Sequence, residues 1–224
     1  MVNSLGQAEE SRKKEPRYRT ITIDILRHGE CEDGHCYRGK TDVALSDHGY
    51  TQMLNSVKNI ETQWSYLVSS PLQRCALFAE KLSTQYDIPL QFEKRIEELH
   101  FGDWEGSDID AVWAAQQTAV ENWFTDPVAF PPPNGERADA FASRVVNAIQ
   151  ELTETLPVSH SHILLVTHGG VIRALLAHCL SMPLQKMGQL DVPYACVSRI
   201  KINHDRQTSA FYYQVVAHNV QGIE

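Results

Sequence analysis

The sequence predicts an α/β protein, a three-layer α/β/α sandwich with a mainly parallel central sheet. Apolar stretches of strand length alternate with amphipathic stretches of helix length, which is the order found in a sheet covered on both faces. The stretch 163–167 is almost wholly apolar, as is typical of a strand in the middle of such a sheet. A chain of 224 residues can bury one sizeable core. We therefore expect one domain at 20–224 after a flexible tail at 1–19.

The first half of this domain contains clear periodicity and helix-start signals. Ile21, Ile23 and Ile25 alternate along the first expected strand. Ser46 is a suitable N-cap, and Ser70-Pro71-Leu72-Gln73 has the pattern of a capping box with proline at the first helical position. The expected elements here are strands at 20–26, 66–69 and 90–92, a long loop at 29–45, and helices at 46–60 and 70–86.

The second half predicts longer helices and a second group of strands. We expect Trp113 and Trp123 to pack a helix at 108–124 against the domain, and the proline-rich segment 127–135 to be a rigid connector. One helix has a core stripe at helical spacing, formed by Phe141, Val145, Ala148, Ile149, Leu152 and Leu156. The remaining expected elements are a strand at 163–167, a helix at 171–180, and strands at 196–202 and 209–216.

Composition narrows the partners and the compartment. The net charge of −8 argues against non-specific nucleic-acid binding, which needs a basic face. No apolar run approaches the roughly 18 residues of a membrane span, and the polar start lacks the apolar stretch of a secretory signal. Five cysteines, an odd number, fit a reducing compartment better than a disulfide framework. We expect a cytoplasmic protein that binds neither nucleic acid nor membrane, while its oligomeric state stays open.

Three strand ends contain residues that suit phosphate chemistry. Arg27 and His28 follow one expected strand, Arg74 lies in the first turn after another, and His168 ends a third. Ligands of such folds bind at the carboxyl ends of strands, so we expect these side chains to converge. A neutral imidazole can attack phosphorus, and arginine can hold two phosphoryl oxygens. Backbone N–H groups at the helix start near Gly169 can add to the anion site.

Five motifs, in this order, resemble those of the histidine phosphatase superfamily, which has the phosphoglycerate-mutase-like fold. The resemblance covers roughly residues 20–200. The motifs are Leu26-Arg27-His28-Gly29-Glu30, Tyr37-Arg38-Gly39-Lys40-Thr41-Asp42 with Leu45, Ser69-Ser70-Pro71-Leu72-Gln73-Arg74, Glu98-Leu99-His100-Phe101-Gly102-Asp103-Trp104-Glu105-Gly106, and Thr167-His168-Gly169-Gly170-Val171-Ile172-Arg173.

This resemblance implies a phosphomonoester hydrolase that works through a phosphohistidine. His28 would be the nucleophile, and Glu98 would donate a proton to the leaving group and later activate water. The phosphoryl group would be bound by Arg27, Arg74 and His168, together with the N–H at Gly169. The resemblance implies no metal and no cofactor, and its partner is a small phosphorylated metabolite.

Within the superfamily, the narrower similarity is to the alpha-ribazole-5'-phosphate phosphatases of cobalamin synthesis. It rests on the run 101–106, on 173–176 and on Val192-Pro193-Tyr194. A broad-specificity phosphatase and a phosphoglycerate mutase with the same site stay open as alternatives, although the mutases usually have a longer insertion between the acid and the second histidine. The substrate pocket is expected to be lined by 29–45, 104–135 and 192–196.

Four other patterns have simpler interpretations. Residues 34–41 match the nucleotide-binding pattern G-x-x-x-x-G-K-[ST], but no strand immediately precedes them and no helix opens at their end, so a nucleotide-binding switch is disfavoured. Cys31, where the family usually has Thr or Ser, is a weaker donor than a hydroxyl. Cys31, His35 and Cys36 together do not have the sequence spacing of a zinc site. We expect Asp108 to cap a helix, and Arg173 to make a structural pairing.

Overall fold

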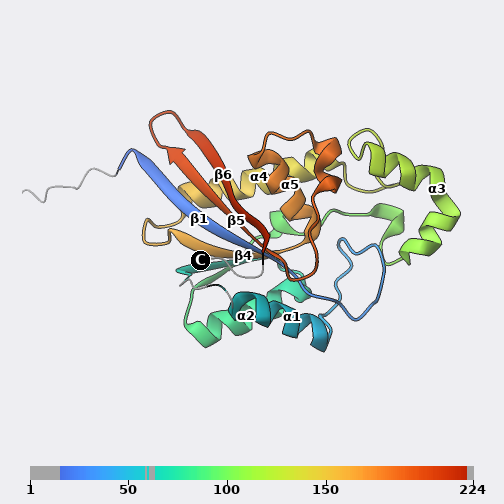
Figure 1. Cartoon of the computed structure of the whole chain (residues 1–224), viewed down its shortest axis with the longest axis horizontal. Coiled ribbons are helices and arrows are strands. Elements are labelled where there is room, and N and C mark those ends of the chain that lie inside the picture. Colours follow the sequence, from blue (N-terminus) through green and yellow to red (C-terminus); the bar gives the residue numbers. More distant parts are fainter. Residues whose placement is uncertain (1–15, 59, 61–63, 221–224) are drawn as a thin grey trace, which may run out of the picture.

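Within the residues that the computed structural model describes, 16–58, 60 and 64–220, six strands form one mixed sheet (Figure 1). Their order is β3-β2-β4-β1-β5-β6. The bounds are β1 Tyr18–Arg27, β2 Tyr66–Ser69, β3 Leu90–Phe92, β4 His162–Thr167, β5 Val197–Asp205 and β6 Ala210–Val220. β1 to β4 run parallel to one another, and β5 and β6 add antiparallel strands at one edge. The mainly parallel sheet is confirmed.

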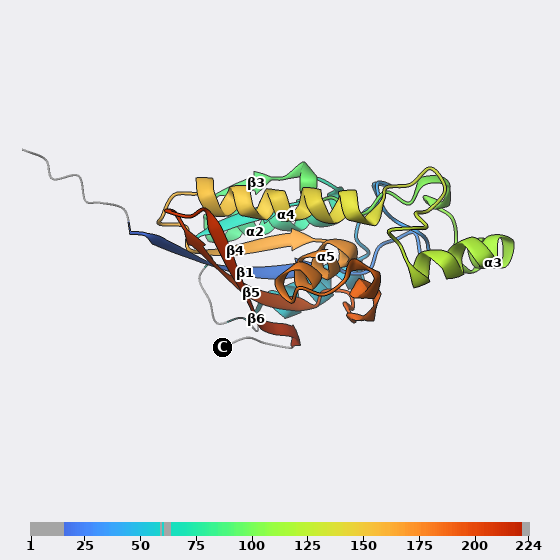
Figure 2. The same cartoon turned by 90° about the horizontal axis from the view of Figure 1, so that it is seen from above.

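Helices cover both faces of the sheet, as the three-layer prediction requires. Their bounds are α1 Asp47–Lys58, α2 Gln73–Tyr86, α3 Ile109–Thr125, α4 Ala138–Thr155 and α5 Gly169–Cys179. α1 and α2 lie on one face, and α4 and α5 on the other (Figure 1). α3 lies beyond the ends toward which the parallel strands point, at one end of the molecule (Figures 1 and 2). No helix of the described part is long and apolar enough to cross a membrane.

Strand β1 connects the two helical layers. Ile21, Ile23 and Ile25 are buried in the core that contains the stripe of α4 and much of α5. Leu26 is buried in the opposite core, with Met53 of α1. Successive side chains of a strand point to opposite faces, so one short strand supports both layers. Each such buried side chain contributes about 2 kcal/mol to the stability of the fold.

A buried carboxylate interrupts the apolar side of β1. Asp24 is fully buried and accepts hydrogen bonds from Trp64, from His162 and from Arg199, its cross-strand partner on β5. Burial alone would raise its pKa, but these hydrogen bonds outweigh burial and hold the pKa below its ordinary value. The charge is thus stabilised inside the sheet, away from the strand ends.

One expectation about the N-terminal side of the domain is wrong. Tyr18 and Arg19, which we expected in the tail, form the start of β1, because the Arg19 guanidinium donates to the carbonyls of Glu154 and Pro157 at the end of α4. Residues 1–15 of the expected tail lie outside the described residues.

The expected capping box at Ser70 is also wrong. Helix α2 begins at Gln73, and its first amide donates to the carboxylate of Asp42 from the 29–45 loop at 2.8 Å. The Ser70 hydroxyl instead bonds the His168 ring at 2.8 Å. In contrast, the caps at Ser46 and Asp108 are confirmed by their bonds to the amides of Gly49 and Ala111.

On α3, Trp123 packs against the domain as expected, but Trp113 does not. Trp113 is 40% exposed and contacts Phe124 on the same helix. The helix is interrupted at Gln116, whose φ of −137° is not helical, and its side chain accepts a hydrogen bond from Trp104 at 3.0 Å. This irregularity changes which residues of α3 face inward.

Candidate active site

Neighbouring parallel strands bring the two histidines together. β1 pairs with β4 so that Arg27 lies opposite Thr167, and the residue after each strand is a histidine. The His28 amide donates to the Thr167 carbonyl at 2.9 Å, which extends the ladder by one bond. The rings of His28 and His168 therefore lie edge to face with their centroids 5.3 Å apart. The expected convergence at the strand ends is confirmed for this pair.

The buried ring of His28 has a defined protonation state. Its Nδ1 lies 2.8 Å from the Gly29 carbonyl oxygen, which can only accept, so Nδ1 has the proton and Nε2 has the lone pair. Burial lowers the pKa of this imidazole well below its usual value, and the positive charges of Arg74 and Arg27 lower it further. His28 is thus a neutral imidazole with an electron pair on Nε2.

His168 is fully buried and both of its ring nitrogens are engaged. Nδ1 accepts from Arg74 Nε at 3.2 Å, so Nε2 has the proton and donates to Ser70 Oγ at 2.8 Å. Burial, followed by the charge of Arg74, lowers the pKa of this ring well below its usual value. A neutral ring with a fixed Nε2–H can donate to an oxygen.

Arg74 fixes the 29–45 loop against the strand ends. Its terminal nitrogens donate to the carbonyls of Thr41 and Gly39 at 2.8 and 2.7 Å. The amides of Gly39, Lys40 and Thr41 donate in turn to the Glu105 carboxylate, at 3.0 to 3.2 Å. In a nucleotide-binding loop these amides would hold phosphate, so the match at 34–41 is not a nucleotide site in this structure.

Arg27 has an unpaired N–H beside Gly169. Its guanidinium lies 4.2 Å from the centre of the Tyr194 ring and donates to the Val192 carbonyl, but its buried Nε has no hydrogen-bond partner. A Cβ at Gly169 would lie 3.2 Å from this nitrogen. A buried guanidinium N–H without a partner is a donor that suits an anion.

Glu98 is held by the first turn of α5. Its carboxylate accepts from its neighbour Leu99 and from Gly170, both at 3.0 Å. The amide of Gly170 is one of the unpaired donors at a helix start. The helix start that we expected to bind phosphate thus also positions a carboxylate, which is 8% exposed.

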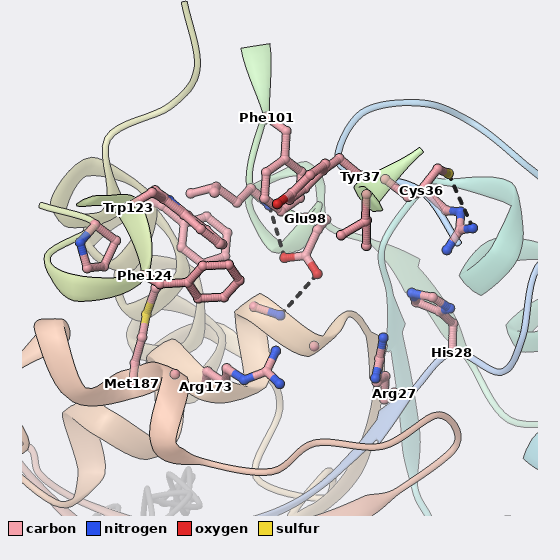
Figure 3. Close-up of a pocket in the computed structure, with 18 of the residues that line it drawn as sticks. Arg27, His28, Cys36, Tyr37, Glu98, Phe101, Trp123, Phe124, Arg173 and Met187 are labelled. Atoms are coloured by element: carbon pink, nitrogen blue, oxygen red, sulfur yellow. Dashed lines mark hydrogen bonds between the residues drawn. The ribbon is translucent and has the colours of Figure 1, made fainter. Parts of the chain in front are cut away.

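Arg27, His28 and Glu98 line one cavity of about 440 Å³ (Figure 3), whereas the fully buried Arg74 and His168 are not among its lining residues. One end is polar and has His28, Arg27 and Glu98, whereas the other end is aromatic. The aromatic end contains Tyr37, Phe101, Trp123 and Phe124. Tyr37, Trp123 and Phe124 come from segments that we expected to line a pocket, whereas Phe101 lies just outside them, so that expectation is confirmed in part.

Arg38 and Tyr194 also line the cavity, although the sequence analysis gave them no role. Arg38 pairs with Asp33 and reaches the Tyr194 hydroxyl at 3.5 Å. The Tyr194 ring lies 5.7 Å from that of His28. Both residues lie inside motifs that resemble those of the family, and this was the only indication in the sequence that they belong to the site.

Arg173 and Cys31 both lie close to the site, but in different ways. Arg173 donates to the Leu190 carbonyl at 3.0 Å, a structural pairing as expected, but its guanidinium also lines the cavity (Figure 3). The Cys31 sulfur lies 3.7 Å from Nδ1 of His28, on the side of the ring away from the lone pair. Among the described residues, no group of three or more His, Cys, Asp or Glu is placed to hold a metal.

Fold and site together define a class of α/β protein in which two buried histidines and several arginines gather at the carboxyl ends of parallel strands. The sequence profile of the histidine phosphatase superfamily (branch 1) matches residues 23–214, and the chain belongs to this superfamily.

Its relatives include phosphatases with two different named substrates. The adenosylcobalamin/alpha-ribazole phosphatase of Escherichia coli is 30% identical over 183 residues, which cover 80% of this chain and 89% of that protein. The glucosyl-3-phosphoglycerate phosphatase of Mycolicibacterium vanbaalenii is 32% identical over 174 residues, which cover 74% and 77% of the two chains.

Solved structures give the same two groups. A mycobacterial glucosyl-3-phosphoglycerate phosphatase superposes with a TM-score of 0.79 at 25% identity, covering 90% of this chain and 100% of that one. The alpha-ribazole phosphatase of Shigella flexneri gives 0.76 at 25% identity, covering 91% and 98%.

The packing of Glu98 against α5 predicts that Gly170→Ala inactivates the enzyme. An added Cβ would lie 2.3 Å from Glu98 Oε1, so the carboxylate of the expected proton donor must move. We expect a loss of about 100-fold in hydrolysis of an aryl phosphate, in the range for a misplaced acid–base group. Gly188→Ala is the matched control, because it lies in the same cavity wall and its Cβ would meet nothing within 4 Å. Equal activity of the two variants would contradict the close packing of Glu98.

Proposed function

We propose that this protein is a phosphomonoester hydrolase in which Nε2 of His28 is the nucleophile. The observation that carries the proposal is the state of this imidazole, which is buried and neutral, and whose only proton is held by the Gly29 carbonyl. A histidine at its ordinary pKa near 6.5 would be partly protonated at neutral pH, and its protonated fraction could not attack. The positive charges around His28 keep its lone pair available at neutral pH.

In the first step, Nε2 of His28 forms a bond to phosphorus and the ester P–O bond breaks. Glu98 is the proton donor in this proposal: it gives a proton to the leaving oxygen and is a carboxylate afterwards. The phosphoryl oxygens are held by Arg27 and by Arg74, whose two terminal nitrogens each keep one N–H beyond the bonds to Thr41 and Gly39. The amide of Gly169 completes the phosphoryl site, and His168 would join it by exchanging the bond from its Nε2–H to Ser70 Oγ for one to a phosphoryl oxygen.

In the second step, water attacks the phosphohistidine. The Glu98 carboxylate takes a proton from this water, and the P–N bond to His28 breaks as the P–O bond forms. The products are inorganic phosphate and a neutral His28, so the cycle returns every group to its starting state. This chemistry uses only side chains of the chain itself.

His28→Ala should abolish turnover. We expect hydrolysis of p-nitrophenyl phosphate to fall by about 10⁴-fold or more, as on removal of a covalent nucleophile. Rapid quenching of the wild type should give an acid-labile, base-stable phosphoenzyme that the variant lacks. EDTA should leave wild-type activity unchanged. His48→Ala, at an exposed position on α1, is the control and should keep full activity. A fully active His28→Ala enzyme, or turnover that requires added metal, would refute the mechanism.

Glu98→Gln should slow esters according to their leaving group. An alkoxide must be protonated as it leaves, whereas p-nitrophenolate is stable without a proton. We therefore expect the loss for an alkyl phosphate to exceed that for p-nitrophenyl phosphate by about 100-fold. The neighbouring Glu97→Gln is the matched control and should affect both esters little. Equal losses for both esters in Glu98→Gln would assign the proton to another group.

For the substrate, we propose alpha-ribazole 5'-phosphate. Two features support this choice: the aromatic end of the cavity, which suits a flat benzimidazole base, and the relatives named for alpha-ribazole. The second candidate is a glucosyl-3-phosphoglycerate, supported by the other group of relatives. Arg173 also favours this second candidate. Its guanidinium lines the cavity, and no carboxylate of the described residues lies within 4 Å of it. The carboxylate of a glycerate would be a suitable partner.

Steady-state kcat/KM on a panel of esters separates these candidates. We expect alpha-ribazole 5'-phosphate to be hydrolysed about 100-fold more efficiently than glycerol phosphate or sugar phosphates, because only its base fills the aromatic end. A higher value for glucosyl-3-phosphoglycerate would select the second candidate. A flat profile would indicate a broad-specificity phosphatase, and interconversion of phosphoglycerates without phosphate release would indicate a mutase.

A further inference from the structure

Two polar atoms in the aromatic end of the cavity lack hydrogen-bond partners. They are the hydroxyl of Tyr37 and the indole N–H of Trp123, both buried. Tyr37 is only 5% exposed, and both residues line the cavity. The neighbouring Trp104 differs, because its indole donates to Gln116 at 3.0 Å. Buried polar groups in folded proteins are nearly always paired, so two orphans in one wall require an explanation.

The two orphan groups lie on adjoining rings. The rings of Tyr37 and Trp123 meet edge to face, with centroids 6.5 Å apart and an interplanar angle of 83°. The hydroxyl end of Tyr37 is turned toward Trp123 (Figure 3). An indole N–H only donates, and a phenol can donate or accept. The missing partner common to both is therefore a hydrogen-bond acceptor.

The surroundings restrict what kind of molecule brings this acceptor. The Tyr37 ring also packs against Phe101, with centroids 5.2 Å apart, and Trp123 packs against Phe124 at 4.9 Å. Flat aromatic groups pack favourably in such walls. The rings packed against the two orphan groups are uncharged, so a neutral acceptor is favoured over an anion, which would lose its hydration without a counter-charge beside it.

We propose that Tyr37 and Trp123 recognise an in-plane acceptor nitrogen of an aromatic heterocycle in the leaving-group half of the substrate. This rests on the proposed phosphatase function and sharpens its specificity. A benzimidazole riboside has one such nitrogen, opposite its glycosidic nitrogen. Phe124 covers Trp123 but is 58% exposed, so a change of its side-chain rotamer can open the path to the two donors.

The test compares two esters that differ in one ring atom. One is a benzimidazole riboside 5'-phosphate, and the other is the matching indole riboside 5'-phosphate, which has C–H in place of the acceptor nitrogen. Their dissociation constants are measured by calorimetry on His28→Ala protein, so that neither ester is consumed. We expect the benzimidazole ester to bind about 10-fold more tightly, as for one or two buried hydrogen bonds.

Adding Tyr37→Phe or Trp123→Phe to His28→Ala should each reduce this ratio about threefold, and adding both should bring it to about one. Tyr37→Phe should not lower the thermal midpoint, because the hydroxyl that it removes is already unpaired. Tyr66→Phe, whose hydroxyl bonds Gln91 elsewhere in the sheet, is the control and should keep the wild-type ratio.

Equal binding of the two esters, or a ratio that neither variant changes, would overturn this inference. Failure of both esters to bind would overturn it too. Wild-type hydrolysis of p-nitrophenyl phosphate reports separately on the phosphatase, so the proposed function can stand when the inference falls.

Discussion

The buried guanidinium of Arg74 is the interaction on which the site depends. It donates to the His168 ring and to two carbonyls of the 29–45 loop, and thereby joins a strand end, a helix and a loop. Glu105 holds the amides of the same loop from the other side. With both its carbonyls and its amides bound, the segment Gly39–Thr41 has little freedom to move. The proposed phosphoryl site would thus depend on Arg74 as a structural group as well as a charge.

The same guanidinium explains how an acidic protein can bind an anion. The chain has a net charge of −8, yet Arg27 and Arg38 line the polar end of the cavity, and the charges of both and of the buried Arg74 act on His28. These positive charges, added to burial, depress the pKa of His28 and keep its imidazole neutral. In the proposed mechanism, an entering phosphate ester would compensate the positive charge that keeps His28 neutral. Binding and activation would then have one electrostatic origin.

Much of this site could be predicted from the sequence because strand ends of a parallel sheet must meet at one edge. His28, Arg74 and His168 needed only that rule. The errors arose where a side chain had a distant partner: Ser70 bonds His168 rather than its own helix, and Arg19 bonds the end of α4. No local pattern reveals such a partner. The sequence indicated Glu105 only as part of a motif. Its role in holding the loop could not be predicted, because the loop amides that donate to its carboxylate lie 64 to 66 residues away in the chain.

Chemistry and specificity reside in different parts of this fold. The groups proposed to act on the phosphoryl end lie at or after the ends of β1 and β4 and at the start of α2 and α5, and Glu98 is bonded to the first turn of α5. The aromatic end is built from Tyr37 on a loop and Trp123 on α3, a helix with an irregular turn outside the layers. Loops and peripheral helices tolerate change more easily than buried strands do. Relatives of similar identity can therefore share one reaction while their names give different substrates, and the aromatic end of the cavity is where such substrates would be distinguished.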